Sequence, residues 1–164
     1  MADQGVRRKS NNEIEERLAA LEAFNSTAKP GFSAWLTGNV AVNNDKVVWD
    51  ATQWNYGNGF NTSTGQFTAP KKGRYLFIVR LTSNGVQSFN FGFLSVGGAG
   101  ARTRDMFEAN TASFSTNGER VSSTILELEQ GDIVDFRING TFTPEGTNEN
   151  FYSLFQGQLL DEGE

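Results

Sequence analysis

The side chains that most often perform catalysis near neutral pH are missing from this sequence. The chain contains no histidine and no cysteine, which removes the commonest general base, the usual zinc ligands and the thiolate nucleophile. Catalysis would then need a lysine, an unusually activated hydroxyl, or paired carboxylates such as Asp45 with Asp50 or Asp105 with Glu108. Such acids are ordinarily exposed loop residues. We therefore expect no enzymatic activity.

A charged cluster is the first candidate ligand contact. Arg102, Arg104 and Asp105 follow the glycine-rich stretch 97–100 and form the most concentrated group of charges in the body of the chain. Two guanidinium groups suit a carboxylate, such as that of sialic acid, through charge-assisted bidentate hydrogen bonds. The alternative is a solvated loop edge.

A group of aromatic residues is the second candidate ligand contact. Trp49, Trp54 and Tyr56 lie close together in the sequence, and such rings could stack on the face of a sugar. The alternative is ordinary packing, because aromatic residues beside strands more often serve the core. We take Trp54 and Tyr56 as the candidates for ligand contact.

The distribution of charge excludes nucleic acid as an expected partner. The formal net charge is −5, and residues 32–160 hold nine basic against eleven acidic side chains. Duplex binding needs a clustered basic face, and the run 7–9 is more simply a solvated leader. No apolar run is long enough to span a membrane. No signal peptide is visible, because the first residues carry charge without an apolar stretch behind them.

One helix is expected, over residues 10–28, ending before Pro30. Ser10 and Glu13 form a capping box, in which each side chain satisfies a backbone donor at the start of the helix. A helix this short is marginal in water unless it packs on something. Its apolar positions follow the spacing of a two-heptad coiled-coil seam, so we expect self-association, the alternative being a helix folded back on its own domain. These positions are Ile14, Leu18 and Leu21.

From Phe32 onward the apolar residues alternate with a period of two, which predicts strands. Segments such as 74–82 and 88–96 are joined by short Gly/Asn turns, which require antiparallel pairing. No helix-length pattern separates them, so the domain should be an all-β sandwich or jelly roll. The predicted organisation is a flexible leader at 1–9, the helix at 10–28, a globular domain at 32–160 and an acidic tail at 161–164.

Several strands are apolar on both faces. Leu76 and Ile78 point away from Tyr75 and Phe77 on the same expected strand. A sandwich needs only one apolar face per sheet, so the second face should be covered by an intermolecular contact.

The segment 54–77, WNYGNGFNTSTGQFTAPKKGRYLF, resembles a motif of the globular domain of complement C1q. That motif places an aromatic residue and a Thr-Gly-x-Phe ahead of a proline, a glycine and a Tyr-x-Phe. Three further matches follow the family's order and together span residues 32–160: FSA at 32–34, LEL with GDIV at 126–134, and FQGQLL at 155–160.

The resemblance implies a ten-stranded jelly roll that assembles as a compact homotrimer, which a parallel coiled coil would match. Its core would include Phe67, Tyr75, Phe77, Leu128, Val134, Phe155 and Leu159. Gly65 would occupy a turn that requires positive φ, and Asp132 would cap backbone donors of a turn. The subunit contact would be formed by Trp35, Leu76, Ile78, Ile125, Tyr152 and Leu154.

The resemblance also sets the functional expectation. The chain has no Gly-X-Y collagen stalk. In this respect it is similar to the stalk-less members of the family that are common in invertebrate defence. These resemble soluble, secreted pattern-recognition lectins. We therefore expect a non-enzymatic, extracellular trimer that binds glycans or microbial surfaces in innate immunity. Calcium is a possible ligand, as in some members, and no other cofactor is expected. The alternative is a structural, matrix or signalling trimer whose partner is a protein.

Overall fold

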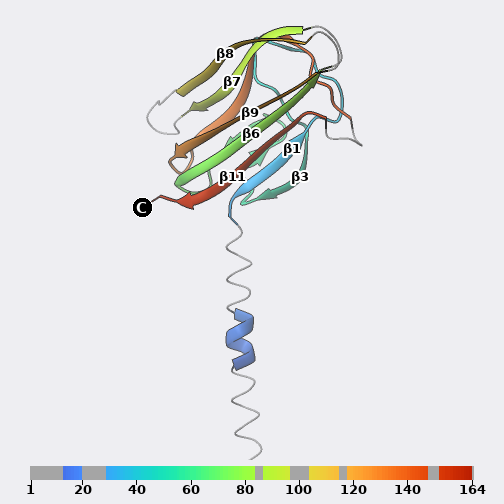
Figure 1. Cartoon of the computed structure of the whole chain (residues 1–164). Helices are drawn as coiled ribbons and strands as arrows, with labels where there is room; N and C mark the ends of the chain where they lie inside the picture. Colours follow the sequence, from blue (N-terminus) through green and yellow to red (C-terminus); the bar gives the residue numbers. More distant parts are fainter. Residues whose placement is uncertain are drawn as a thin grey trace, which may run out of the picture.

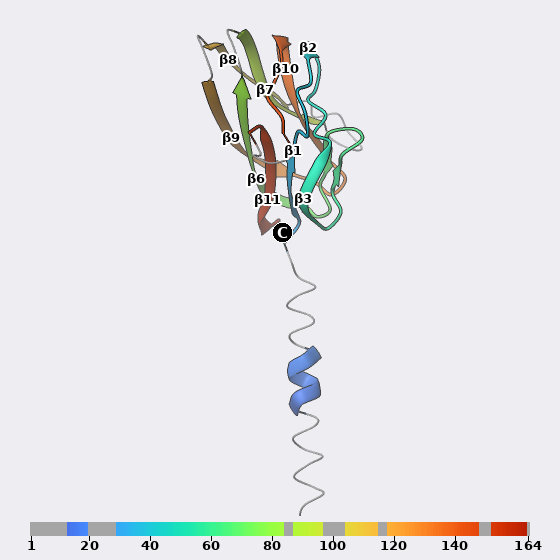
Figure 2. The same cartoon turned by 90° about the vertical axis from the view of Figure 1, so that its right-hand side faces the viewer.

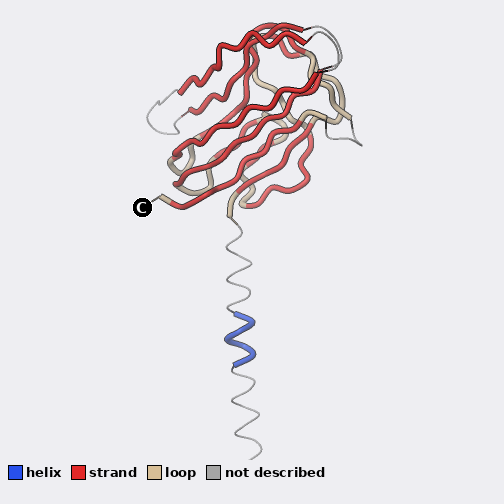
Figure 3. Tube along the Cα trace, viewed as in Figure 1, coloured by secondary structure: helices blue, strands red, loops and turns tan. Residues whose placement is uncertain are grey.

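The computed structural model describes residues 13–19, 29–83, 87–96, 104–114, 118–147 and 152–163, with side chains left out for strand residues 87–91, 93–96 and 104–114. Within these ranges the chain forms eleven strands (Figure 3). They are β1 (Gly31–Trp35), β2 (Val42–Asn43), β3 (Ala51–Tyr56), β4 (Phe60–Asn61), β5 (Gln66–Thr68), β6 (Gly73–Ser83), β7 (Gln87–Val96), β8 (Arg104–Phe114), β9 (Gly118–Leu128), β10 (Ile133–Phe142) and β11 (Leu154–Glu162).

The strands form two antiparallel sheets that pack as a sandwich (Figures 1 and 2). The first sheet has the order β3-β1-β11-β6-β9. The second has the order β4-β5-β10-β7-β8, with β2 paired to β10. The expected all-β jelly roll is confirmed. The structure has eleven strands where ten were expected, and two of them, β2 and β4, contain only two residues each.

The core lies between the sheets and is built from the inward residues of the alternating strands. In β6, every second residue from Gly73 to Ser83 is buried. Phe32 lies at the centre of an aromatic cluster, with its ring 4.3 Å from that of Phe60 and 4.8 Å from that of Phe155. The predicted core residues are all buried, which confirms that prediction: Phe67, Tyr75, Phe77, Leu128, Val134, Phe155 and Leu159.

Two turns behave as the sequence predicts. Gly65 has a φ of +67°, and a Cβ there would lie 2.4 Å from the carbonyl oxygen of Val47, so both conformation and space require glycine. In the turn before β10, the Asp132 carboxylate accepts a hydrogen bond of 2.9 Å from the Glu129 backbone N–H. This bond supports a turn-capping role for Asp132.

The N-terminal helix is described over residues 13–19, inside the predicted range, and all seven residues are exposed. Ile14 and Leu18 of the expected seam lie in it. Leu21 and the leader at 1–9 lie outside the described residues. Among the described helical residues, none forms a segment long and apolar enough to cross a membrane.

The segment that leads into the first strand, β1, lies beside the last strand, β11. The N–H of Leu159 donates to the carbonyl of Pro30 at 2.8 Å, and Gln158 Nε2 donates to the carbonyls of Lys29 and Pro30. The Lys29 ammonium also donates to the Leu160 carbonyl. The entry point is therefore fixed to the C-terminal half of β11.

Candidate functional site

The outward side of the five-stranded sheet, called the outer face below, carries the candidate residues. Strand pairing fixes its rows, because residues opposite each other on paired strands share a face. One row runs Tyr56, Gly31, Gln158, Leu76, Ile125, and the next runs Trp54, Ser33, Gln156, Ile78, Ser123. A third row, beyond a bulge between β1 and β3, runs Ala51, Trp35, Leu154, Arg80, Val121.

One half of the outer face is an apolar block. Ile125 and Val121 on β9 are 57% and 60% exposed, far more than aliphatic side chains on a face covered by protein. Their neighbours on β6 and β11 are half-buried. The apolar block comprises Leu76, Ile78, Val121, Ile125 and Leu154.

Among the described side chains of these three rows, Arg80 is the one cation, and it lies within the apolar block. Arg80 pairs with Val121 on one side and with Leu154 on the other. Its Nε donates to the Tyr152 carbonyl at 3.2 Å, and the Thr82 hydroxyl donates to the same oxygen at 2.7 Å. These bonds hold the segment before β11 against β6.

The structure brings the six predicted contact residues together. Trp35, Leu76, Ile78, Ile125 and Leu154 occupy the outer face by register, and Tyr152, which is exposed, precedes β11 at its edge. Their role as a subunit contact remains a prediction. Val121 was not among the contact residues predicted from the sequence, although its alternation with Ile125 on β9 was a usable signal.

A polar column, formed by Gly31, Ser33, Gln156 and Gln158 on β1 and β11, crosses the outer face beside the apolar block. Gln156 Nε2 donates to the Ser33 hydroxyl at 3.1 Å. A Cβ on Gly31 would lie 3.0 Å from Gln158 Oε1, so this amide oxygen lies over the glycine. The polar column was not predictable from the sequence, because small and amide residues within an alternating strand carry no distinctive motif.

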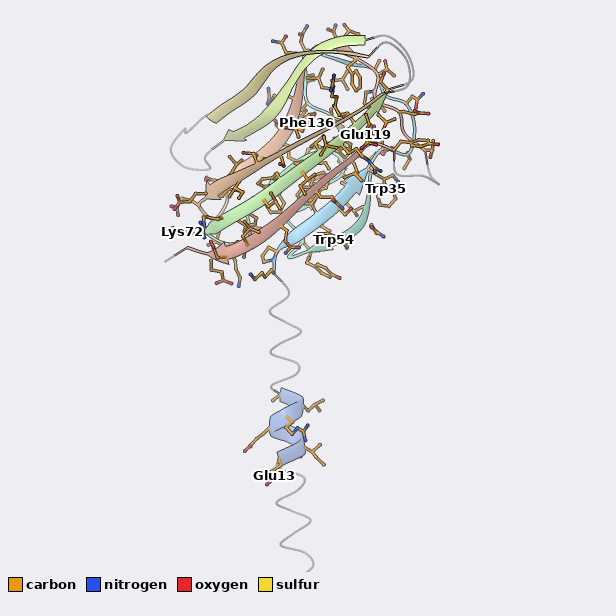
Figure 4. All side chains as sticks on the ribbon, in the orientation of Figure 1. Glu13, Trp35, Trp54, Lys72, Glu119 and Phe136 are labelled. Atoms are coloured by element: carbon orange, nitrogen blue, oxygen red, sulfur yellow. The ribbon has the colours of Figure 1, made fainter. Side chains whose placement is uncertain are left out.

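An aromatic pair lies beyond the polar column, on the edge strand β3. The rings of Trp54 and Tyr56 are stacked, with centroids 5.4 Å apart and planes 25° from parallel. Tyr56 is 53% exposed and Trp54 is half-buried. Figure 4 labels Trp54 beside β1 and β3, with Trp35 on the same side of the sandwich.

The two candidate ligand groups occupy opposite edges of the sandwich. Arg104 and Asp105 begin β8, at one edge of the six-stranded sheet, and are described by backbone alone. Arg102 lies outside the described residues. Because β3 is the far edge of the other sheet, the arginines and the Trp54–Tyr56 pair are separate groups within one subunit. Trp49 is fully buried against Phe136 and Phe155 and belongs to the core.

Several carboxylates of the described side chains serve local structure. Asp50 accepts hydrogen bonds from the backbone and hydroxyl of Thr37, and Asp45 accepts one from the Lys46 N–H. Arg74 holds Asp161 in a two-point ion pair and lowers the pKa of that carboxyl. In the described part of the chain, no three acidic side chains lie close enough to hold a metal ion.

Comparisons with known proteins agree with this architecture. The family model of the C1q domain matches residues 31–160. No curated protein matches the chain in sequence. Among solved structures, the globular domain of the zebrafish complement 1qA protein has a TM-score of 0.66 and 18% identity, covering 82% of this chain and 99% of that one.

Two further solved structures come from tumour necrosis factor proteins. Eiger TNF from S. frugiperda has a TM-score of 0.60 at 18% identity, covering 83% of this chain and 96% of that one. Murine APRIL has a TM-score of 0.55 at 16% identity, covering 79% and 99%. These likenesses show a shared fold, and the family-model match extends over nearly the whole sandwich. The chain belongs to the C1q domain family.

Proposed function

We propose that this protein is a non-enzymatic homotrimeric recognition module. The observation that carries the proposal is the apolar block, whose five aliphatic side chains share one face of one sheet and include two that are more than half exposed. Exposed aliphatic side chains gathered on one face in this way are typical of an interaction site. Domains of this family are typically trimeric recognition or signalling modules.

The subunit contact in this proposal consists of Trp35, Leu76, Ile78, Ile125, Tyr152 and Leu154. A second copy covering the apolar block would remove these side chains from water and so drive association. The N-terminal helix adds a parallel coiled coil through Ile14, Leu18 and Leu21. Two heptads contribute modestly, so the sandwich contact supplies most of the stability of the trimer.

The ligand in this proposal is a glycan or a microbial surface, recognised as part of innate immunity. Arg104 and Asp105 begin β8, an edge strand, and Arg102 precedes Arg104 by two residues in the sequence; two guanidinium groups suit an acidic sugar. Three copies in one assembly convert weak single contacts into avidity. Proteins with this domain are usually extracellular, which is where such ligands occur. In this proposal a calcium ion at the ligand site would be bound by oxygen atoms of the loops.

Light scattering and a glycan array test the proposal directly. The intact protein should have the mass of three chains at micromolar concentration, and it should bind a subset of acidic glycans. A monomer or dimer mass would refute the trimer. A trimer that binds no glycan, with or without calcium, but captures a protein ligand would favour the structural or signalling alternative.

A further inference from the structure

The tripeptide at positions 61–63 has the sequence Asn-Thr-Ser, which is an acceptor sequence for N-linked glycosylation. Such short sequences also arise by chance, so the surroundings of the asparagine decide whether it can carry a glycan. A glycan is large and hydrophilic, and the folded chain must leave the asparagine side chain in water with space beside it. The asparagine must also lie away from the subunit contact.

The side chain of Asn61 is open to solvent. Asn61 ends β4 and is exposed, and so is Ser63. The Asn61 Oδ1 atom accepts a hydrogen bond of 2.9 Å from the Ser63 backbone N–H, which is the pattern of an Asx turn. Within the described part of the chain, the Asn61 Nδ2 atom takes part in no hydrogen bond. The nitrogen to which a glycan is attached is therefore not used by the fold.

The turn that carries Asn61 is held mainly by backbone atoms. The N–H groups of Thr64 and Gly65 donate to the Asn61 carbonyl at 3.2 and 2.8 Å. Gly65 supplies the positive φ that this turn requires. Neither the Asn61 Nδ2 atom nor the Ser63 hydroxyl forms part of these bonds, so a glycan attached to Asn61 would break no contact of the turn.

Asn61 also lies on the side of the sandwich opposite the apolar block. It pairs with Gln66 of β5, so the two side chains share a face of the six-stranded sheet. The adjacent pair, Phe60 and Phe67, is buried in the core, so Asn61 and Gln66 face outward. The subunit contact proposed above lies on the other sheet. A glycan on Asn61 would therefore extend from the outer wall of the trimer.

Two other sequences of this type are present in the chain. The one at 25–27 lies outside the described residues. The one at 139–141 lies within β10, and its Thr141 hydroxyl donates to Asn43 Oδ1 at 3.3 Å. In that tripeptide the fold already uses the hydroxyl group, so Asn61 is the stronger candidate.

We propose that Asn61 is an N-glycosylation site, modified as the chain passes through the secretory pathway. The donor is an oligosaccharide linked through N-acetylglucosamine to a lipid pyrophosphate. The Nδ2 atom loses a proton and forms a bond to the anomeric carbon of that sugar. The bond from this carbon to the pyrophosphate oxygen breaks, and the lipid pyrophosphate leaves with the electron pair. The inference rests on the extracellular setting of the proposed function.

The modification would also protect an edge of the sandwich. β4 is the end strand of the six-stranded sheet, and a free sheet edge exposes backbone N–H and C=O groups that can pair with another chain. A glycan on this strand would hinder such pairing sterically. It would therefore favour a defined trimer over larger aggregates.

The test is expression of the full chain behind a secretion signal in cultured mammalian cells, which takes it through the secretory pathway whatever its native location. Peptide-N-glycosidase releases the glycan and converts the modified asparagine to aspartate, so mass spectrometry of the peptides locates each occupied site. The wild-type protein should be modified at Asn61. Asn61→Asp keeps an oxygen acceptor for the Ser63 N–H, and Ser63→Ala removes the hydroxyl of the acceptor sequence. Both variants should lose this modification completely, and Ser63→Thr should retain it.

Light scattering of the secreted proteins tests the position of the glycan. The glycosylated wild type and Asn61→Asp should both be trimers, because Asn61 faces away from the apolar block. A glycosylated monomer that becomes a trimer after enzymatic removal of the glycan would place Asn61 in the subunit contact and refute the proposal. A secreted trimer without a glycan at Asn61 would also refute it, while leaving the recognition function intact. A trimer modified at Asn61 that recognises no glycan or microbial surface would support the site and contradict the recognition function.

Discussion

The carboxylate of Asp135 lies 2.9 Å from the Nε of Arg137, two residues along the same strand, and is completely buried while the guanidinium is 37% exposed. Gln66 Nε2 donates to the second carboxylate oxygen at 3.1 Å. The neighbouring residues Val134, Phe136 and Ile138 face the core, so Asp135 points to the other side of β10. The six-stranded sheet therefore carries, on its outward side, an ion pair whose carboxylate is buried and whose arginine is partly exposed.

Neutralising this carboxylate should destabilise the domain. In Asp135→Asn, Arg137 loses its charged partner in a partly buried setting, and we expect the free energy of unfolding to fall by about 1–3 kcal/mol. Urea denaturation at one fixed protein concentration measures the change. Asp45→Asn, at an exposed carboxylate, is the control and should stay within about 0.5 kcal/mol. Equal effects of the two variants would show that the ion pair contributes nothing specific.

The phenol of Tyr75 should make the protein sensitive to alkaline pH. Its ring is buried, its hydroxyl donates to the Lys71 carbonyl at 2.8 Å, and burial raises its pKa above the ordinary value of 10.0. In the folded state the proton is held more tightly than in the unfolded state. Its contribution to stability is therefore complete below pH 10 and is lost as the pH rises through the folded-state pKa.

Tyr75→Phe should remove this component of the pH dependence. Thermal melts between pH 9 and 11.5 should show a shallower loss of stability for the variant than for the wild type. At neutral pH the variant should be less stable by about 0.5–1.5 kcal/mol, since it lacks the hydrogen bonds between the phenol and the Lys71 backbone. Parallel curves for the two proteins would argue that Tyr75 keeps an ordinary pKa.

The apolar block can be disrupted without disturbing the fold. Ile125 is largely exposed in the subunit and pairs with Leu76 on the neighbouring strand. Ile125→Glu should weaken trimer formation by about 2–5 kcal/mol, because an unpaired charge would be buried in an apolar contact. Light scattering should report smaller particles with an unchanged circular dichroism spectrum. Glu127→Gln, on the same strand, should remain trimeric, and a trimeric Ile125→Glu would place the contact elsewhere.

Removal of the N-terminal segment should leave a folded sandwich. The buried core of the described chain begins at Phe32, so a chain lacking residues 1–28 retains every core strand. Its trimer should be weaker but detectable, because two heptads add little alone. Sedimentation at decreasing concentrations measures the shift. Loss of folding in the truncated chain would show that the helix packs on the sandwich, and would refute the coiled-coil interpretation.

Substitution of Arg102 and Arg104 should weaken the binding of acidic ligands and leave the stability of the domain unchanged. Replacing Arg102 and Arg104 with Ala should reduce binding to sialylated surfaces, and the reduction should be steeper on a multivalent surface than with a free monosaccharide. The free energy of unfolding should change by no more than about 0.5 kcal/mol. Unchanged surface binding would move the acidic-ligand site elsewhere, and a sharp loss of stability would make the arginines structural.

Sequence periodicity predicted which side chains face the core. It did not predict which strands are neighbours within each sheet. The alternation of Tyr75 and Phe77 with Leu76 and Ile78 assigned inward and outward sides correctly, because the side-chain period of a strand is fixed. Strand order depends on contacts between distant segments, which local patterns do not encode. The wide separation of Arg104 from the Trp54–Tyr56 pair was therefore invisible in the sequence.

The buried carboxylate was equally hidden. Asp135 stands in an alternating strand at a position that ordinarily faces water, and nothing in its neighbourhood distinguishes it from a solvated acid. Its burial depends on Gln66, a residue 69 positions earlier, and on Arg137 folding back along its own strand. The polar column depends in the same way on the pairing of β1 with β11.

The adjacency of β1 and β11 determines how the domain responds to mechanical force. These antiparallel neighbours pair Gly31 with Gln158 at the end where the chain both enters and leaves the sandwich. Tension applied between residues 30 and 162 would open their ladder one hydrogen bond at a time, like a zipper, instead of shearing all of the bonds together. The sandwich is therefore suited to the end of a tether, where load passes through one attachment, and poorly suited to a position in series within a load-bearing strand of matrix.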